Sequence, residues 1–213
     1  MKKLLLLIAL GIGLWYWYDG KIPLMATPGA FDNAGNPIVW VFTFRDCGAP
    51  CQDAIKDLKN RNVTFVEKPI DPANTQDADV KLWKAHGSPS LPLIVVGEGA
   101  MSGFMKSELG ALLAESFGAK YLHAAERRYF NNHFNTDGSP RIVMYATDWC
   151  GYCKRLRAEF RENNVEFTEI DIEKVPDGDI LASTMGIRGV PATWVGYRRV
   201  HGSSLSEVKK AFR

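Results

Sequence analysis

An internal repeat limits the fold of this chain more than any other feature of its sequence. When the second half is displaced by 102 positions, Cys51 falls on Cys153 and residues 62–65 fall on residues 164–167. With a displacement of 99, further matches follow in the same order: Pro92 with Pro191, Val96-Gly97 with Val195-Gly196, Gly103 with Gly202, and Ser107-Glu108 with Ser206-Glu207. Self-similarity of this kind indicates one structural unit present twice. The chain therefore contains two copies of one fold, with a small insertion in the first.

Each copy has the same expected order of elements: strand, helix, strand, helix, strand, strand, helix. Short apolar runs predict the strands, and apolar residues three or four apart predict the helices. In the first copy the predicted segments are 38–44, 49–60, 63–67, 77–85, 93–96 and 106–117, while 98–102 has little strand character. In the second copy they are 141–146, a helix carrying Cys153, Leu156 and Phe160, a strand marked by Val165, Phe167 and Ile172, and then 180–185, 192–195, 198–200 and 204–212. This order predicts an α/β fold in which each copy is a small mixed sheet flanked by helices.

The segment between the copies predicts a connecting helix. Residues 120–134 carry apolar side chains on one helical face, and the turn-forming run 135–140 follows them. We therefore expect a first domain over 37–118, a helical linker over 119–139 and a second domain over 140–213.

The composition excludes several classes of protein. Hydrophobic residues make up 46% of the chain and charged residues 23%, which is ordinary globular usage and fits neither a disordered chain, a collagen-like fibre nor a multi-span membrane protein. A net charge of +2 provides no broad electrostatic surface for nucleic acid, so we expect no nucleic-acid partner. Four cysteines are too few to build a disulfide scaffold, so their spacing carries the information.

The amino terminus resembles an export or anchoring signal. Lys2 and Lys3 precede an apolar run over residues 4–14, and aromatic residues fill 15–18. A helix over 4–18 would be about 22 Å long, short of a hydrocarbon core of about 30 Å, but lysine snorkelling and local thinning can close that gap. We expect residues 1–20 to be an uncleaved membrane anchor, with the domains outside the cytoplasm, in the periplasm. The alternatives are a cleaved signal peptide on an exported soluble protein and a buried or surface-lying helix.

The strongest chemical signal is Trp149-Cys150-Gly151-Tyr152-Cys153, which falls between a predicted strand and a predicted helix. A cysteine at a helix amino end is favoured as a thiolate, and a second cysteine one turn later is close enough to resolve a mixed disulfide. The same pair also fits an inert disulfide or half of a zinc site. Zinc needs two more ligands, and the sequence has no second Cys-x-x-Cys or neighbouring histidine pair. We therefore expect a redox pair and no metal.

With these residues and the later Gly189-Val190-Pro191-Ala192, the second copy resembles the thioredoxin superfamily in its small glutaredoxin-like form. The resemblance is strong over 140–213 and weak over 37–118. It implies two tandem thioredoxin-fold domains and a cis proline at Pro191 that faces the cysteine pair. It further implies thiol–disulfide exchange in which Cys150 attacks, Cys153 resolves, Val190-Pro191 holds the substrate strand, and Trp149 and Tyr152 shape the rim.

The residues that bind glutathione in glutaredoxins are matched here only in part. Tyr152 agrees with the family, but Gly189 replaces a threonine, no lysine shortly precedes the cysteine pair, and His201-Gly202-Ser203-Ser204 lacks the second glycine and the acid of the family's turn. No nucleotide or flavin site is evident. We therefore expect no bound cofactor, glutathione as a candidate co-substrate, protein or small-molecule thiols as substrates, and a partner thiol as electron donor or acceptor.

The first copy carries Cys47 and Cys51 with three residues between them, and Leu91-Pro92 matches the proline element. Three interpretations stay open: a modified redox pair, a structural disulfide in a degenerate copy, and a metal site. The metal interpretation follows copper-delivery proteins on a thioredoxin fold, which resemble Cys-x-x-x-Cys with a distant histidine; His86, His123 and His133 are the candidates. The alternative to an exchange enzyme is thus a non-enzymatic thioredoxin-fold scaffold or copper-binding module using Cys47 and Cys51.

Overall fold

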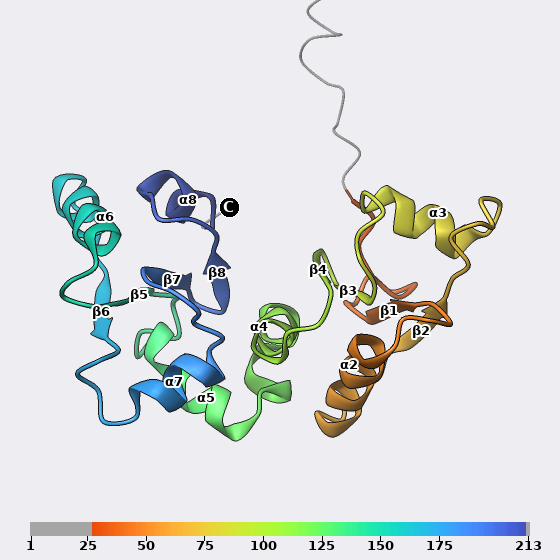
Figure 1. The fold of residues 1–213 in the computed structure, drawn as a ribbon, viewed down its shortest axis with the longest axis horizontal. Helices are drawn as coiled ribbons and strands as arrows, with labels where there is room; N and C mark the ends of the chain where they lie inside the picture. The colour runs from red at the N-terminus through yellow and green to blue at the C-terminus, as the bar shows by residue number, and fades with distance from the viewer. Residues whose placement is uncertain (1–26, 212–213) are drawn as a thin grey trace, which may run out of the picture.

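The computed structural model of the protein describes residues 27–211 and contains the repeat as two similar units (Figure 1). The first unit consists of β1 (Val39–Thr43), α2 (Ala49–Asn60), β2 (Val66–Pro69), α3 (Ala78–Ala85), β3 (Leu93–Val96), β4 (Gly99–Ser102) and α4 (Lys106–Phe117). The second consists of β5 (Ile142–Ala146), α6 (Gly151–Glu162), β6 (Thr168–Asp171), α7 (Gly178–Thr184), β7 (Ala192–Val195), β8 (Arg198–Val200) and α8 (Leu205–Lys210). The expected order of elements is present in both.

Each unit has a four-stranded mixed sheet, and the two sheets have the same topology. The strand orders are β2-β1-β3-β4 and β6-β5-β7-β8. In each sheet the first pair of neighbours is parallel and the other two pairs are antiparallel. The predicted α/β architecture of two small mixed sheets flanked by helices is therefore confirmed.

The central strands are buried on both faces, which explains their uninterrupted apolar sequences. In β5, Ile142, Met144 and Ala146 pack on the side of α6 and α8, while Val143 and Tyr145 pack on the side of α7. Figure 1 shows α6 and α8 on one side of the second sheet and α5 and α7 on the other. Alternation along each strand thus divides the unit into two apolar layers.

The second strand of each unit begins later than the sequence predicts. Val63 and Val165 were expected to lie in strands, but they follow Asn62 and Asn164, whose φ angles are 57° and 53°. The amide of Val63 donates to the carbonyl of Leu58 at 3.0 Å, and that of Val165 donates to Phe160 at 2.8 Å. These are the bonds of a Schellman motif, in which the residue after the left-handed position packs back on the helix. The repeated Asn-Val pair therefore ends a helix.

Two further expectations differ from the structure. The weakly predicted strand near residues 98–102 is a regular β4 that pairs antiparallel with β3 along its whole length. The connecting helix over 120–134 is broken into the short helices 118–121, α5 (Ala124–Phe130) and 131–133. The break has a local cause: Leu122 is extended, and His123 starts α5 in a capping box with Glu126.

The predicted anchor over residues 1–20 lies outside the described residues. Within 27–211, none of the helices has both the length and the apolar character needed to cross a bilayer.

Helix α4 belongs to the first unit but packs into the cores of both. Its Leu109 and Leu113 pack with the side chains of β1, β3 and α2, whereas Ala111 and Ala114 pack in the cluster that contains Trp194 of β7. Two ion pairs join the same helix to β8: Glu108 with Arg199 at 3.5 Å, and Glu115 with Arg198 at 3.3 Å. Figure 1 shows α4 between the two sheets.

A buried ion network fixes α5 against the first unit. The side chain of Arg61, which is 0% exposed, contacts Asp57 at 2.6 Å and Glu126 at 2.7 Å. Arg61 also donates to the backbone carbonyls of Tyr121 and Lys106 at 2.9 and 3.2 Å. A buried guanidinium is stable only when its donors are satisfied, and here two carboxylates and two carbonyls satisfy them.

In the second unit, His133 is fully buried against the sheet. Its Nδ1 lies 2.8 Å from the Gly196 carbonyl and its Nε2 lies 2.8 Å from the Tyr145 hydroxyl. A carbonyl only accepts, so Nδ1 carries the proton and Nε2 accepts from Tyr145. Burial lowers the pKa of His133 to about 4, so the ring is neutral at pH 7.

Candidate active site

Cys150 and Cys153 lie at the amino end of α6 and form a disulfide, with their Cα atoms 5.2 Å apart. Cys150 is the N-cap residue, and its Sγ accepts the backbone N–H of Cys153 at 3.1 Å. Unpaired N–H groups and the helix dipole at this end favour negative charge on sulfur when the pair is reduced. Cys150 is 4% exposed and Cys153 is 0% exposed, so the first sulfur is the one that a partner can reach.

The Val190-Pro191 segment lies directly against this pair. The Val190–Pro191 peptide is cis, as the resemblance implied, and the Val190 carbonyl oxygen lies 3.4 Å from Cys150 Sγ. Within the described residues, the backbone N–H of Val190 has no hydrogen-bond partner. The segment therefore brings a free backbone donor and the Cys150 sulfur together. The structure thus brings Cys150, Cys153, Val190 and Pro191 into one site.

Trp149 and Tyr152 flank the cysteines and are the most open aromatic side chains there, at 68% and 59% exposed. The indole N–H of Trp149 donates to the Glu173 carboxylate at 2.9 Å. The guanidinium of Arg155 lies 5.2 Å from the centre of the Tyr152 ring. These contacts hold both rings at the edge of the site, where they present apolar surface to a partner.

Asp148 is the acidic group closest to the pair in sequence, and its charge is already offset. Its carboxylate forms an ion pair with Lys174, which also contacts Asp171 at 3.3 Å. The hydrogen bond from Lys174 lowers the pKa of Asp148, and the bond to Asp148 raises the pKa of Lys174. Asp148 therefore adds little negative potential against a thiolate at Cys150, since this exposed pair is screened by solvent.

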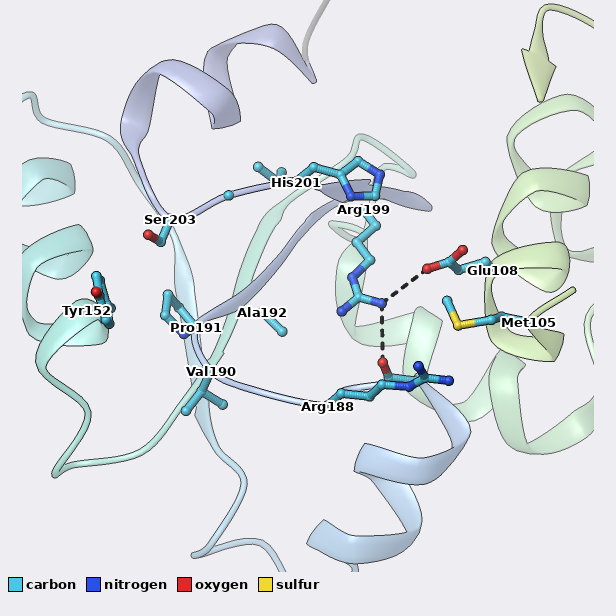
Figure 2. A pocket seen from close by; sticks show the side chains of 13 residues that line it. Met105, Glu108, Tyr152, Arg188, Val190, Pro191, Ala192, Arg199, His201 and Ser203 are labelled. Carbon is cyan, nitrogen blue, oxygen red and sulfur yellow. Dashed lines mark hydrogen bonds and ion pairs between the residues drawn. The ribbon is translucent and has the colours of Figure 1, made fainter. Parts of the chain in front are cut away.

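A cavity of about 500 Å³ lies between the two units and extends to Tyr152, Val190 and Pro191 (Figure 2). Tyr152, Val190 and Pro191 form its end nearest the cysteines, and Met105 and Glu108 of the first unit form its far wall. Arg188 and Arg199 add two positive charges to the lining, and His201 also contributes to it. We call this space the inter-unit cleft.

The two arginines of the inter-unit cleft differ in the number of contacts that they make. Arg199 contacts Glu108 at 3.5 Å, donates to the Gly186 carbonyl at 3.2 Å, and lies 5.2 Å from the centre of a Trp194 ring. Arg188 is exposed and forms no ion pair within the described residues. Figure 2 shows the Arg199 and Glu108 side chains meeting across the cleft. Sequence reasoning missed Arg188, Arg199, Met105 and Glu108, and the only sequence signal was the basic residues close to Pro191 and on the last strand.

The first unit places its two cysteines at the equivalent position. Cys47 and Cys51 form a disulfide at the start of α2, with their Cα atoms 5.8 Å apart, and the Leu91–Pro92 peptide is cis.

The candidate metal-binding histidines lie in other environments. His86 contacts the Pro28 carbonyl, His123 contacts Asp57, and His133 is buried in the second unit. Over residues 27–211, no group of three or more His, Cys, Asp or Glu side chains is arranged to hold a metal ion.

Comparison with known proteins assigns a family to the second unit. The glutaredoxin family model matches residues 142–200. A glutaredoxin of Pseudomonas aeruginosa is 36% identical over 64 residues, which cover 30% of this chain and 76% of that protein. The chain belongs to the glutaredoxin family. This membership supports a thiol-redox function in general, and the match lies in the unit that contains Cys150 and Cys153.

Two solved structures of this family also align with the chain. A buckwheat glutaredoxin–glutathione complex is 25% identical, covering 34% of this chain and 67% of that one, with a TM-score of 0.29. A mutated buckwheat glutaredoxin is 22% identical, covering 42% of this chain and 79% of that one, with a TM-score of 0.34.

Proposed function

We propose that the protein is a thiol–disulfide oxidoreductase whose reacting groups are Cys150 and Cys153. The position of Cys150 supports this most directly. Its sulfur lies at the start of α6, accepts an N–H from Cys153 and sits 3.4 Å from the Val190 carbonyl beside the inter-unit cleft. A thiolate stabilised in this way, next to a buried second thiol, suits disulfide exchange.

The exchange proceeds in two steps. The Cys150 thiolate attacks one sulfur of a substrate disulfide, the substrate S–S bond breaks, and the other substrate sulfur leaves as a thiolate that takes up a proton. The Cys153 thiolate then attacks Cys150 Sγ, which releases the second substrate sulfur and forms the Cys150–Cys153 disulfide. Two electrons pass from the protein to the substrate, and a partner thiol restores the dithiol by the reverse sequence.

The substrate chain is held by the Val190 backbone and the exposed rim. The free N–H of Val190 can pair with an extended substrate segment, and this keeps the substrate sulfur next to Cys150. Trp149 and Tyr152 cover the apolar part of the bound segment.

Glutathione is the small thiol that the inter-unit cleft suits best. Glutathione carries two carboxylates, and the cleft offers Arg188 free of ion pairs together with His201. Guanidinium–carboxylate pairs are among the stronger polar contacts in proteins, and a volume of about 500 Å³ is sufficient for a tripeptide. We propose that glutathione enters from this side and is a co-substrate.

We also propose that the amino terminus anchors the protein in a membrane. The basic start and apolar run over residues 2–18 support a membrane anchor with both units outside the cytoplasm. Fractionation of cells that express the full chain tests this, and recovery of the intact chain in the soluble fraction would exclude an anchor.

Measurement of the reduction potential of the Cys150–Cys153 pair tests the proposed function. The full chain is equilibrated in glutathione buffers of known poise, and free thiols are trapped and located by mass spectrometry. A value near about −270 mV would indicate a reductase, and one above about −180 mV an oxidase or isomerase.

Paired variants provide the control. Turnover of a small disulfide is expected to fall at least about a hundredfold in Cys150→Ser and to persist in Cys47→Ser. Persistence in Cys150→Ser together with copper binding that is lost in Cys47→Ser would instead identify a metal-carrying module.

A further inference from the structure

The second cysteine occupies the same helical position in both units. Helix α2 begins at Ala49 and α6 begins at Gly151, and the third residue of each is a cysteine. Cys51 is 6% exposed and Cys153 is 0% exposed, so both are core residues under the first turn. The first unit therefore retains the buried half of an exchange site.

The first cysteine differs between the units because one residue is inserted. Cys150 is itself the N-cap of α6, whereas Gly48 is the N-cap of α2 and Cys47 precedes it. Gly48 has φ 69° and ψ −149°, a backbone conformation that favours glycine strongly. The insertion leaves Cys47 partly exposed, in contrast to the buried Cys150.

The residues on either side of Cys47, over 44–46 and 48–50, are all exposed to solvent. Asp46 stands where the second unit has Trp149, and Pro50 stands where it has Tyr152. The two aromatic residues that flank the cysteines of the second unit are therefore replaced by short side chains, and Phe44, which is 36% exposed, is the nearest aromatic residue to Cys47 in sequence. The short side chains leave room for a thiol carried on the surface of another protein.

We propose that Cys47–Cys51 is a second, separate exchange site and that its partners are protein thiols and protein disulfides. It goes beyond the function proposed for Cys150 and Cys153 and does not depend on it. Two observations carry it: the partial exposure of Cys47 over a buried partner, and the short side chains of Asp46 and Pro50 in place of the aromatic Trp149 and Tyr152 that flank the cysteines of the second unit.

The reaction at this site balances without a cofactor. A thiolate of a reduced partner attacks Cys47 Sγ, the Cys47–Cys51 bond breaks, and Cys51 leaves as a thiolate in the first turn of α2. That turn contains no acidic residue, so its N–H groups and dipole stabilise the leaving charge. A second partner thiolate then attacks the partner sulfur of the mixed disulfide and displaces Cys47. The partner leaves oxidised by two electrons, and Cys47 and Cys51 take up two protons.

The test uses the full chain with Cys150→Ser and Cys153→Ser, so that only the first pair can react. This variant is equilibrated in buffers of increasing reduced-to-oxidised glutathione ratio, and the thiols are trapped with a maleimide. We expect two thiols per chain to appear together over a defined range of ratios while circular dichroism remains that of the folded protein. A pair that stays oxidised at every ratio and opens only on unfolding would overturn the proposal and identify a structural disulfide.

A second measurement identifies the sulfur that reacts first. In the same background, Cys51→Ser leaves Cys47 alone and Cys47→Ser leaves Cys51 alone. An oxidised cysteine peptide is expected to form a mixed disulfide with Cys47 about tenfold faster than with Cys51, because attack requires an accessible sulfur. Equal rates at the two cysteines would overturn the proposal. Because Cys150 and Cys153 are absent, neither result bears on the second unit.

Discussion

The two units have the same topology, but they use their polar residues for different purposes. In the second unit, the residues that follow β5 and precede β7 form the candidate redox site and one end of the inter-unit cleft. In the first unit, the strongest polar cluster is the buried network of Arg61, Asp57 and Glu126, which fixes α5. The apolar pattern thus gives the same fold twice, while polar residues at a few positions make different contacts in the two units.

Matched positions sharpen this contrast. Arg61 follows α2, and the corresponding residue after α6 is Asn163. Asp57 on α2 contacts Arg61, whereas Glu159 at the same place on α6 accepts the N–H of Leu205 at 2.8 Å. The same helix position therefore holds the linker in one unit and starts α8 in the other.

The largest expected effect is a loss of stability when Arg61 is replaced, compared with replacement of Asn163 at the corresponding position of the second unit. Arg61→Ala leaves two buried carboxylates without their partner and is expected to lower the free energy of unfolding by about 3–5 kcal/mol. Asn163→Ala, at an exposed helix end, is expected to change it by less than about 0.5 kcal/mol. Urea unfolding of both variants provides the measurement. Similar losses of unfolding free energy in the two variants would show that the buried ion network of Arg61 adds no stability specific to the first unit. If Arg61→Ala does not fold, Arg61→Lys replaces it and is expected to show a smaller loss.

The next effect is a dependence of stability on pH that comes from His133 in the second unit. In the first unit, Ala30 stands at the position that corresponds to His133. The backbone amide of Ala30 donates to the carbonyl of Gly97, which corresponds to Gly196. The folded protein protonates His133 only near pH 4, but the unfolded chain does so near 6.5. Below pH 6.5 the unfolded state binds the extra proton, so the free energy of unfolding falls by about 3 kcal/mol down to pH 4 and then levels off.

His133→Asn supplies the control for this prediction, since asparagine cannot titrate. The difference between the unfolding free energies of the parent and the variant is measured by urea denaturation from pH 7.5 to pH 4. It is expected to shrink as the pH falls. A difference that is constant over this range would contradict a neutral buried His133.

The smallest expected effect concerns the contribution of the first unit to the inter-unit cleft, and it rests on glutathione as co-substrate. Arg188→Gln removes the free cation and is expected to raise KM for glutathione about fivefold, while Glu108→Gln releases Arg199 and lowers KM two- to fivefold. Both leave kcat unchanged. Glu115→Gln is the matched control, since Glu115 pairs with Arg198 on the same two elements but does not line the cleft. Steady-state kinetics of the three variants give KM and kcat for glutathione. Equal changes in KM for Glu108→Gln and Glu115→Gln would show that the first unit does not contribute to glutathione binding.

Much of this fold follows from local sequence signals. Apolar runs located the central strands of both sheets. The resemblance to the thioredoxin superfamily implied that Pro191 would face the cysteine pair, and Val190 next to it lies 3.4 Å from Cys150 Sγ. The starts of β2 and β6 were misplaced because a β-branched valine after an asparagine suits both a strand and a helix end, and only the bond from Val63 to Leu58 separates the two. The inter-unit cleft was not predictable, because Glu108 and Arg199 are brought together by packing between units and not by local sequence.

Helix α4 has a consequence for how such a protein can be divided. Because Ala111 and Ala114 fill the layer around Trp194, a piece that starts at residue 119 would lose apolar cover from the second sheet, although the glutaredoxin match begins only at residue 142. A piece that ends after α4 would instead expose those alanines to water. The two copies therefore cannot be exchanged between tandem proteins at a cut in the connecting segment, and a graft of the second copy into another chain must include α4.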